Sequence, residues 1–553
     1  MKRRRRALAA AVAAVLAAGG FAASATGALG PEDRSAELAA QLDPSKPRNV
    51  ILVIGDGMDD SMITAARNYE LGADGRFAID ELPFTGAMTT HGLKVGTGPD
   101  YPIAYVSDSA PTASAWSTGR KTVDGRISQG PSVAPEIPGE DYETVLEQYA
   151  EQGKLTGNIT TSELTDATPA AAASHINQRS CQGPEDMAAC PAARKANGGK
   201  GSIAEQLVDN EVDVLMGGGL QRFEQDTDAA ETVLEYAQDK HGYRVVRDAE
   251  ELAAIDSLDG GPVLGLFANG NMTPIYEPLV ASPPPGAGGP EARCEEADRG
   301  DQPTLAEMTA KAIELLDNPN GFFLQIESAM IDKQEHASDI CGAIGDLAAL
   351  DEAVRVALDY QAENPDTLIV VTGDHAHSTQ IVPGPSSGRQ TATLQTADGD
   401  PMTVAYSTQA SGSSHTGAQI RVAASGPQAA NVTGVIDQTD LYRTLLGREP
   451  STLPEGPPAP PSVQVGAPRS VKRAELTRNG LLVAVAATGA KRVRVELLAG
   501  GRTLAKATLR GRGASKRLKP RRAGKAKGRL TVIARANGPG GAAEASASVR
   551  LKR

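Results

Sequence analysis

The stretch NVILVIGD, residues 49–56, is a continuous apolar run that ends in a carboxylate. Two later stretches have the same form: GFFLQIES at 321–328 and TLIVVTGD at 367–374. Continuous apolar runs of this length are typical of strands buried on both faces of a parallel sheet. Segments with helical periodicity lie between them, such as residues 304–317 and 346–363. The alternation predicts a three-layer α/β/α sandwich around a mostly parallel central sheet.

Each of the three runs ends in an acidic side chain, namely Asp56, Glu327 and Asp374. In open α/β sheets, ligands bind beyond the carboxyl ends of the strands. A single acid after a strand is most often the cap of the next helix. Here, however, histidines follow closely after two of the three acids. We therefore expect a functional site at this edge of the sheet.

Histidine is scarce in this chain, and its distribution is informative. Four of the seven histidines follow the strand ends or the next loop: His336, His375, His377 and His415. Asp332 lies four residues before His336, so one helical turn would direct both side chains at the same ion. Carboxylate and imidazole ligands without thiolate are typical of catalytic zinc, with oxygen sites nearby for magnesium. The other histidines are expected to be hydrogen-bonded structural residues: His91, His175 and His241.

Seven sequence blocks carry a family resemblance. In chain order they are VILVIGDGM, SDSAPTASAWSTGRKT, TGNITTSELTDATPAA, GGKGSIAEQL, IDKQEHAS, VTGDHAH and SHTGAQIRVAASGP. They resemble the ordered signature blocks of the bacterial alkaline phosphatases. The resemblance extends from Asn49 to Leu446 and does not cover the N-terminal or C-terminal regions. It implies an exported, metal-dependent phosphomonoesterase with two zinc ions and one magnesium ion.

The resemblance also implies the catalytic residues. Ser109 matches the serine that becomes phosphorylated, and Arg179 matches the guanidinium that holds the phosphate, with Asp108 orienting that arginine. A serine without a neighbouring base is a weak nucleophile, but zinc beside its hydroxyl favours the alkoxide. The expected substrates are phosphate monoesters, and inorganic phosphate is the expected product.

Metal ligands are carried over in the same way. One zinc site is implied at three residues: Asp332, His336 and His415. The second is implied at Asp56, Asp374 and His375, and magnesium at Asp56, Thr168 and Glu327. Three more residues match positions behind the ligands: Asp166, Lys333 and His377. Asp59 stands where a small residue is expected, either as a solvated acid without a role or as one that weakens the binding of anionic substrates.

The N-terminus and the cysteines indicate the compartment. Residues 1–25 comprise a basic segment, an alanine-rich apolar run and a small-residue site, the pattern of a secretory signal peptide for the Sec or twin-arginine route. An N-terminal extension would follow at 26–48, and we expect a secreted, periplasmic or cell-surface protein. The even number of cysteines predicts disulfides, with three pairings open from the sequence. The resemblance implies Cys181–Cys190 and Cys294–Cys341.

The C-terminal region has a different composition. Residues 469–553 contain 23 Lys and Arg against 3 Asp and Glu, a net charge of +20, whereas the whole chain has −13, which leaves −33 on the rest. A proline-rich linker at 451–468 separates this region from a catalytic domain at 49–450. Alternating apolar and polar residues predict a small all-β, sandwich-like domain.

The partner of this basic domain is expected to be anionic. We favour an anionic cell wall, polymer or membrane face, with a solvated spacer as the alternative. Aromatic residues are absent from residues 469–553, which argues against nucleic acid because bases could not stack there.

The nucleophile block separates the candidate activities. A sulfatase of the same superfamily would carry C-x-P-x-R, whereas this chain has Ser-Ala-Pro at 109–111. A phosphodiesterase usually has threonine as the nucleophile and lacks the arginine block. A non-catalytic phosphate-binding or adhesion protein is disfavoured by the complete set of ligands. The family is usually homodimeric, so the resemblance also implies a homodimer.

Overall fold

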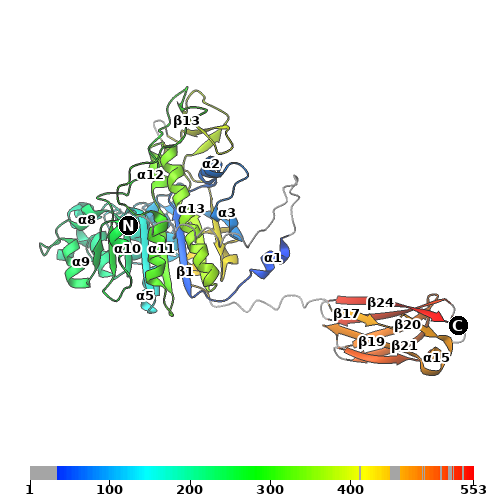
Figure 1. Cartoon of the computed structure of the whole chain (residues 1–553). Coiled ribbons are helices and arrows are strands. Elements are labelled where there is room, and N and C mark those ends of the chain that lie inside the picture. Colours follow the sequence, from blue (N-terminus) through cyan, green and yellow to red (C-terminus); the bar gives the residue numbers. More distant parts are fainter. Residues whose placement is uncertain are drawn as a thin grey trace, which may run out of the picture. The chain divides into compact units, whose positions relative to one another are not determined.

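The computed structural model describes residues 34–409, 413–448 and 461–552, apart from residues 489, 491, 511–512, 521–525, 527 and 539–540. The expected signal peptide and residues 451–460 of the expected linker lie outside the described residues. The chain divides into two compact units, residues 1–449 and 450–553 (Figure 1). Among the described residues, none of the helices combines the length and the apolar character needed to span a bilayer.

A ten-stranded sheet in the order β16-β2-β15-β11-β1-β10-β5-β6-β8-β7 runs through the first unit. The three apolar runs lie side by side at its centre as β11 (Thr367–Gly373), β1 (Asn49–Gly55) and β10 (Phe322–Ser328). They are parallel to one another, and every residue in them is buried. β15 (Ile420–Ser425) is antiparallel to both of its neighbours, so the sheet is mostly parallel, as predicted.

The remaining strands of this sheet are shorter or lie farther from its centre. They are β2 (Phe84–Thr89), β5 (Leu155–Glu163), β6 (Val214–Gly218), β7 (Arg244–Val246), β8 (Val263–Leu266) and β16 (Gly434–Asp437). β5 pairs in parallel with β10, and β6 pairs in parallel with β5. The four strands β11, β1, β10 and β5 therefore present their carboxyl ends at one edge.

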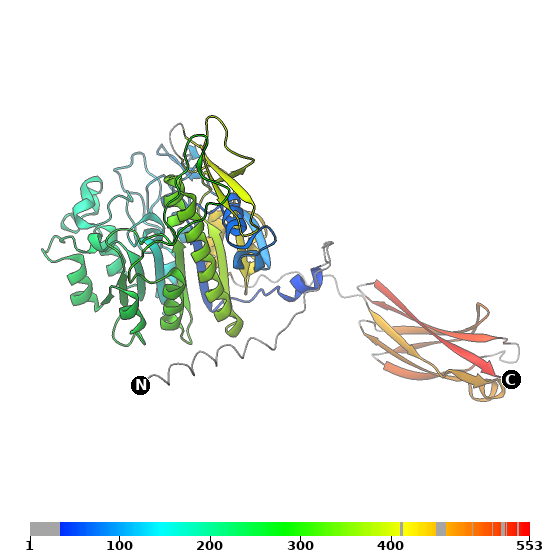
Figure 2. The same ribbon diagram turned by 45° about the horizontal axis from the view of Figure 1, so that its top comes forward.

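Helices cover both faces of the sheet, which confirms the three-layer prediction (Figure 2). Successive residues of β1 enter two separate cores, because side chains alternate between the faces of a strand. Ile51 and Val53 pack in a core with α2 (Asp60–Leu71), α11 (Leu305–Leu316) and α13 (Ile340–Glu363). The other core, around Leu52, is covered by α4 (Ser109–Thr118), α5 (Val145–Glu151), α6 (Ala167–Ala173), α7 (Ile203–Asp209) and α14 (Gln438–Leu445).

A second, four-stranded sheet belongs to the same unit, in the order β12-β14-β13-β9. Its strands are β9 (Ala287–Gly288), β12 (Gln380–Val382), β13 (Gln390–Gln395) and β14 (Pro401–Tyr406). Both disulfides implied by the resemblance are formed, Cys181–Cys190 and Cys294–Cys341. Other elements are α1 (Ser35–Ala40), α3 (Ala78–Glu81), β3 (Gly92–Leu93), β4 (Ile103–Ala104), α8 (Leu220–Phe223), α9 (Val233–His241), α10 (Ala249–Ala253) and α12 (Met330–His336).

The second unit is a small β-sandwich, as predicted. One sheet contains β17 (Ser462–Gly466), β19 (Leu481–Thr488) and β22 (Gly513–Leu518). The other has the order β18-β24-β23-β20-β21, with β18 (Ser470–Lys472), β20 (Arg492–Ala499), β21 (Arg502–Arg510), β23 (Arg529–Gly538) and β24 (Gly541–Lys552). Valine, leucine and alanine side chains fill the space between the sheets. All strand pairs are antiparallel except β18 with β24, and one short helix, α15 (Arg473–Asn479), was not predicted.

Candidate active site

The parallel strands bring the predicted acids to one edge of the sheet. Asp56 directly follows β1, Asp374 directly follows β11, and Glu327 is the penultimate residue of β10. All three are buried. α12 begins two residues after β10 and carries Asp332, which is also buried. Acids so close together repel one another, and burial together with Asp374 and Asp332 raises the pKa of Asp56 well above its usual value.

One group of candidate metal ligands consists of Asp332, His336, His377 and His415. The Nε2 atoms of His415, His377 and His336 lie 3.2, 3.4 and 3.5 Å from Asp332 Oδ1. Ligands about 2.0–2.1 Å from a tetrahedral zinc ion lie roughly 3.3 Å from one another, so this spacing fits zinc. Asp332 Oδ1 is buried without a hydrogen bond of normal geometry, so it has a lone pair that an ion would satisfy. His377 Nδ1 accepts the N–H of Ser378 at 2.8 Å, so the proton of this imidazole is on Nε2.

Backbone carbonyls orient two of these imidazoles. His415 Nδ1 lies 2.9 Å from the carbonyl oxygen of Ser107, and His336 Nδ1 lies 3.3 Å from that of Ser413. A carbonyl can only accept, so each Nδ1 carries the proton and each Nε2 keeps a free lone pair. The two Nε2 atoms lie 3.0 Å apart and face the same point. This arrangement is typical of metal-binding histidines.

A second group, formed by Asp56, Asp332 and His375, surrounds the predicted nucleophile. His375 Nε2 lies 3.4 Å from Asp56 Oδ1 and 3.2 Å from Asp374 Oδ2, which places Asp374 beside this group. Ser109 Oγ lies 3.3 Å from Asp56 Oδ2 and 3.3 Å from His375 Nε2. Any ion held by this group would therefore be adjacent to the serine hydroxyl.

Ser109 is the first residue of α4, and Asp108 caps that helix by accepting the N–H of Ala110 at 3.4 Å. All ten residues of α4 are buried, so its start is fixed by packing. Pro111 is tolerated there because the first turn has no intrahelical partner for its missing N–H. Because Ala110 gives its N–H to Asp108 and Pro111 has none, the N–H of Ser109 is the donor of this first turn that could meet an anion.

Arg179 links two carboxylates at the same site. Its Nη1 donates to Asp108 Oδ1 at 2.6 Å, and its Nη2 donates to Asp166 Oδ1. Lys333 Nζ donates to Asp166 Oδ2 at 2.5 Å. Burial would raise the pKa of Asp166, but Lys333 and Arg179 outweigh burial and hold that pKa below its usual range. The two cations are thus held in place and remain charged.

Glu327 is held by hydroxyl groups of the neighbouring strand. Its Oε2 accepts hydrogen bonds from Thr160 Oγ1 and from Ser162 Oγ, the latter at 3.2 Å. Burial raises the pKa of Glu327 to about 7, while the hydroxyls of Thr160 and Thr168 lower it. Thr168 belongs to α6.

One detail of the site differs from the sequence-based interpretation. Asp59 is not a solvated acid: it is buried and caps α2, accepting the N–H groups of Ser61 and Met62 at 2.9 Å each. Burial raises its pKa to about 6. His377 Nε2 lies 3.4 Å from Asp332 Oδ1, and the position of His377 behind the ligands stays a prediction.

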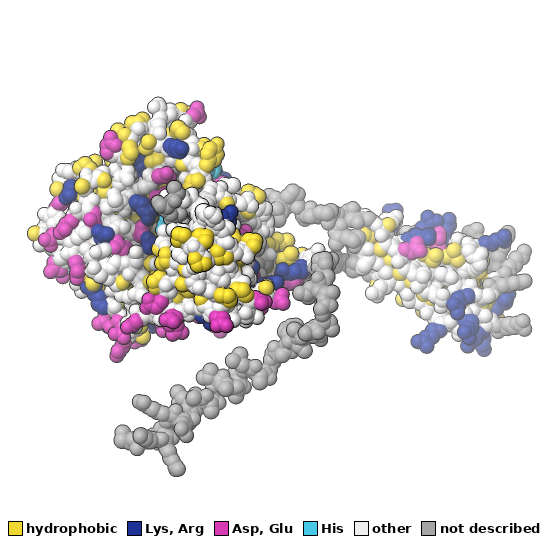
Figure 3. All heavy atoms as spheres, turned by 90° about the horizontal axis from the view of Figure 1, so that it is seen from above, with side chains coloured by type: hydrophobic (Ala, Val, Ile, Leu, Met, Phe, Trp, Pro, Cys, Tyr) yellow, Lys and Arg dark blue, Asp and Glu magenta, His cyan; other side chains and the backbone are white. Residues whose placement is uncertain are grey.

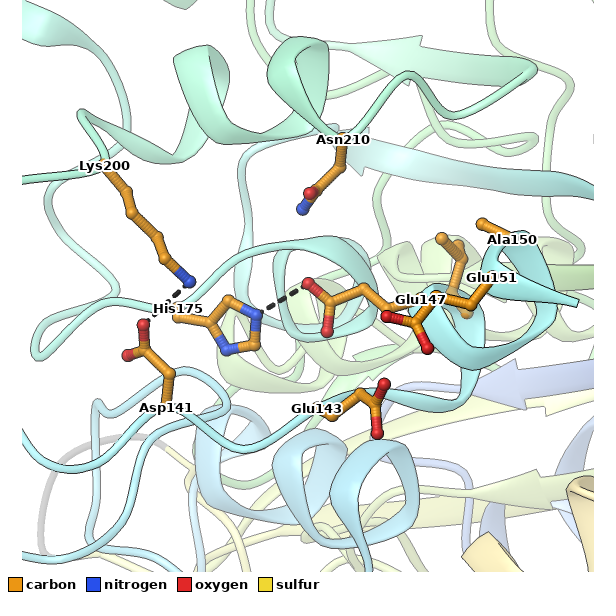
Figure 4. Close-up of a pocket in the computed structure, with 9 residues that line it drawn as sticks. Asp141, Glu143, Glu147, Ala150, Glu151, His175, Lys200 and Asn210 are labelled. Carbon is orange, nitrogen blue, oxygen red and sulfur yellow. Dashed lines mark hydrogen bonds and ion pairs between the residues drawn. The ribbon is translucent and has the colours of Figure 1, made fainter.

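Three histidines lie outside both ligand groups and pair with acids. His175 Nε2 lies 2.8 Å from Glu147 Oε1, and its Nδ1 lies 3.0 Å from the carbonyl oxygen of Ser128. Figure 4 shows His175 directed at Glu147 in a pocket lined by acidic side chains. His241 lies 3.2 Å from Glu211, and His91 lies 3.7 Å from Asp437. His175 and His241 are therefore hydrogen-bonded as expected from the sequence, whereas the contact of His91 is longer than a hydrogen bond.

Comparison with known proteins decides the family. Residues 47–412 match the family model described as alkaline phosphatase. The chain belongs to the alkaline phosphatase family. It is 46% identical to alkaline phosphatase H of Pseudomonas aeruginosa (strain UCBPP-PA14) over 426 residues, which cover 75% of this chain and 87% of that protein. It is 45% identical to a streptomycin-6-phosphate phosphatase of Streptomyces griseus, covering 73% and 90% of the two chains.

The fold comparison agrees with the sequence comparison. The crystal structure of Thermus thermophilus alkaline phosphatase matches with a TM-score of 0.55 at 21% identity, covering 76% of this chain and 95% of that one. The central sheet and its helices are therefore the alkaline phosphatase fold. The chain is a phosphatase of a metal-dependent family, and its two groups of metal-binding residues suit that dependence.

Proposed function

We propose that this alkaline phosphatase hydrolyses phosphate monoesters through a phosphoserine intermediate on Ser109. The observation that carries the proposal is the position of Ser109 Oγ, 3.3 Å from Asp56 and 3.3 Å from His375, at the start of a buried helix. Arg179 reaches the same helix start through Asp108. Nucleophile, ligands and phosphate-binding cation therefore share one site.

The donor sets support two zinc ions and one magnesium ion. Asp332, His336 and His415 would hold one zinc ion, with His377 beside them, and the other would be held by Asp56, Asp374 and His375. Asp56, Thr168 and Glu327 would hold magnesium. These ions, when bound, would polarise the phosphate oxygens and favour the deprotonated serine hydroxyl.

The chain's own groups account for binding and for the two displacements. Arg179 binds the non-bridging phosphate oxygens, and the N–H of Ser109 at the start of α4 faces the same anion. Ser109 Oγ forms a bond to phosphorus as the bond to the leaving alcohol oxygen breaks, and the alcohol leaves with a proton from solvent. Water then cleaves the Ser109 phosphoester, which releases inorganic phosphate and restores the hydroxyl.

A substrate panel with metal analysis tests this function. The purified full chain should hydrolyse a chromogenic phosphomonoester far faster than the matching diester or sulfate ester, and elemental analysis of the same sample should find zinc and magnesium near two to one. Streptomycin 6-phosphate belongs in the panel because the Streptomyces griseus relative is named for it. A diester rate equal to the monoester rate, in a zinc-loaded sample, would favour the phosphodiesterase alternative. Catalysis by a metal-free sample would exclude the mechanism.

We also propose the setting of the enzyme. Residues 1–25 direct export, which N-terminal sequencing of the exported protein would test. The family resemblance supports a homodimer, which light scattering would test.

The basic domain, residues 469–553, would attach the enzyme to an anionic surface polymer. A chain ending near Pro454 should keep its turnover number and zinc content but no longer sediment with anionic wall material at low salt, and equal sedimentation of both forms would exclude the attachment.

A further inference from the structure

The basic β-sandwich has a groove along one open edge. β21 is the last strand of the five-stranded sheet, and β22 is the last strand of the three-stranded sheet. A groove of about 660 Å³ is lined by residues of these two strands and of β20. Five of its lining side chains are basic: Arg494, Lys506, Lys516, Arg517 and Lys519. Both walls carry cations, because Lys506 comes from β21 and Lys516 comes from β22.

Most of this charge is not neutralised within the protein. Glu496 is the only carboxylate in the groove lining, and it already lies 3.1 Å from Arg494 and 3.4 Å from Arg535. Lys506 and Lys516 form no ion pair with any carboxylate of the described residues. Lys516 is paired across the ladder with the buried Val483, so it is directed toward the space between the sheets. Figure 3 shows Lys and Arg side chains gathered on this unit and few acids.

The composition of the unit restricts the partner. Residues 461–552 contain neither aromatic residues nor histidine, so bases could not stack there and the positive charge persists across the physiological pH range. β21 has nine residues and spans about 30 Å, which suits an extended chain better than a compact ion. A phosphodiester directs its two free oxygens to opposite sides of its chain, so cations on both walls can reach one group. A carboxylate holds its two oxygens in one plane.

We propose that this groove binds a linear polymer of phosphodiesters without bases, as on an anionic cell surface. The inference rests on the proposed attachment of the basic domain to anionic polymers, and it names the site and the chemistry of that attachment. Lys516 is directed inward, whereas Lys506 lies on the outer face of its sheet, opposite Glu496. Lysines on edge strands have a second physical effect, because they also prevent pairing between sheet edges of different molecules. Removal of the lysines would weaken polymer binding if the first effect holds and would cause self-association if the second holds.

Two variants of the full chain with equal net charge separate these effects. The groove variant is Lys506→Gln, Lys516→Gln and Lys519→Gln. The control variant is Lys472→Gln, Arg478→Gln and Lys552→Gln, which are exposed residues at or next to β18 and β24, at the opposite edge of the same sheet. Both should keep the wild-type turnover number on a small phosphomonoester, which shows that the catalytic unit is intact. The probe is soluble poly(glycerol phosphate), titrated over a salt series.

Counterion release sets the expected magnitude. With about 0.7 released ions for each phosphate contact of a flexible single strand, loss of three contacts lowers the slope of log K against log salt by roughly two. If the two proteins bind equally at 1 M salt, the affinity of the groove variant at about 0.1 M salt should be roughly a hundredfold below that of the wild-type chain. The control variant should keep the wild-type slope.

Each other result overturns a defined part of the inference. Equal losses of affinity in both variants would mean that the basic domain attracts the polymer through its overall charge. The groove would then not be the binding site, while the attachment of the domain to the polymer would stand. If the groove variant self-associates but still binds the polymer as the wild-type chain does, the only role of these lysines would be to prevent pairing between sheet edges. Polyglutamate of matched charge, if bound as tightly as the probe, would exclude the phosphodiester assignment. A single-stranded oligonucleotide bound as tightly as the probe would exclude the preference for a polymer without bases. A wild-type chain without affinity at low salt would refute the attachment itself.

Discussion

Replacing Arg179 with lysine should weaken phosphate binding without removing the positive charge. Arg179 gives one N–H to Asp108 and one to Asp166, and its side chain is 29% exposed. A guanidinium has five N–H donors, so three remain for the phosphate, whereas an ammonium has three in all and would keep one. A guanidinium binds a phosphate with two parallel N–H groups and the ammonium would bind it with one, so the variant loses one charge-assisted hydrogen bond, about 1.5–3 kcal/mol. The inhibition constant of inorganic phosphate should rise about tenfold to a hundredfold.

Competitive inhibition of monoester hydrolysis by inorganic phosphate measures this constant directly. Arg48→Lys is the control, because Arg48 likewise donates two N–H groups to carboxylate oxygens, here both of Asp366 at 2.6 and 3.3 Å, and precedes β1 at the end opposite to the site. The control should leave the inhibition constant unchanged. An unchanged constant in Arg179→Lys, at equal zinc content, would refute the assignment of Arg179 to the phosphate.

Three further predictions follow from the site and its surroundings. Chelation should abolish activity and lower the melting temperature together, because Asp56, Asp332 and Asp374 would repel one another without cations. Zinc plus magnesium should restore both, and activity that persists without metal would contradict a metal-dependent mechanism. Thr160→Val removes a donor to Glu327 and should raise the magnesium concentration needed for half-maximal activity, with zinc content unchanged as the control measurement. Burial opposes the charge on His175, but Glu147 outweighs burial and raises the pKa of His175. The ion pair therefore stabilises the fold fully below the pKa of the unfolded chain, about 6.5. This stabilisation is lost as the pH rises through the higher pKa of the folded state. His175→Gln in the metal-loaded enzyme should accordingly cost more stability at pH 6 than at pH 9, and an equal cost at both would contradict the ion pair.

The fold could be predicted where burial dictates the sequence. β1, β10 and β11 are buried on both faces, so each is a continuous apolar run that can be recognised without a structure. Short strands such as β12, with three residues, leave no such pattern. α15 also escaped prediction, because its residues Arg473–Asn479 bury little more than Leu476.

The site was predictable as a set of residue types, and less so as a geometry. The pattern of acids and histidines after strand ends indicated metal ions, but Ser109 alone has the sequence of an ordinary helix start. Its contacts come from Asp56, 53 positions away, and His375, 266 positions away, so only the fold brings them together. Thr160 was missed because a threonine inside a strand has no distinctive pattern. Its register partner across the ladder is Glu327, which is how it reaches that carboxylate.

The most direct test of the mechanism is to trap the phosphoenzyme. The zinc-loaded chain would be mixed with a labelled phosphomonoester, quenched in acid, digested and mapped. Label is expected on the peptide that contains Ser109. The Ser109→Ala variant should retain its zinc, lose the label and lose several orders of magnitude in turnover number. Label on Thr112, Ser114 or a histidine would contradict the account, as would a Ser109→Ala variant that turns over at the wild-type rate.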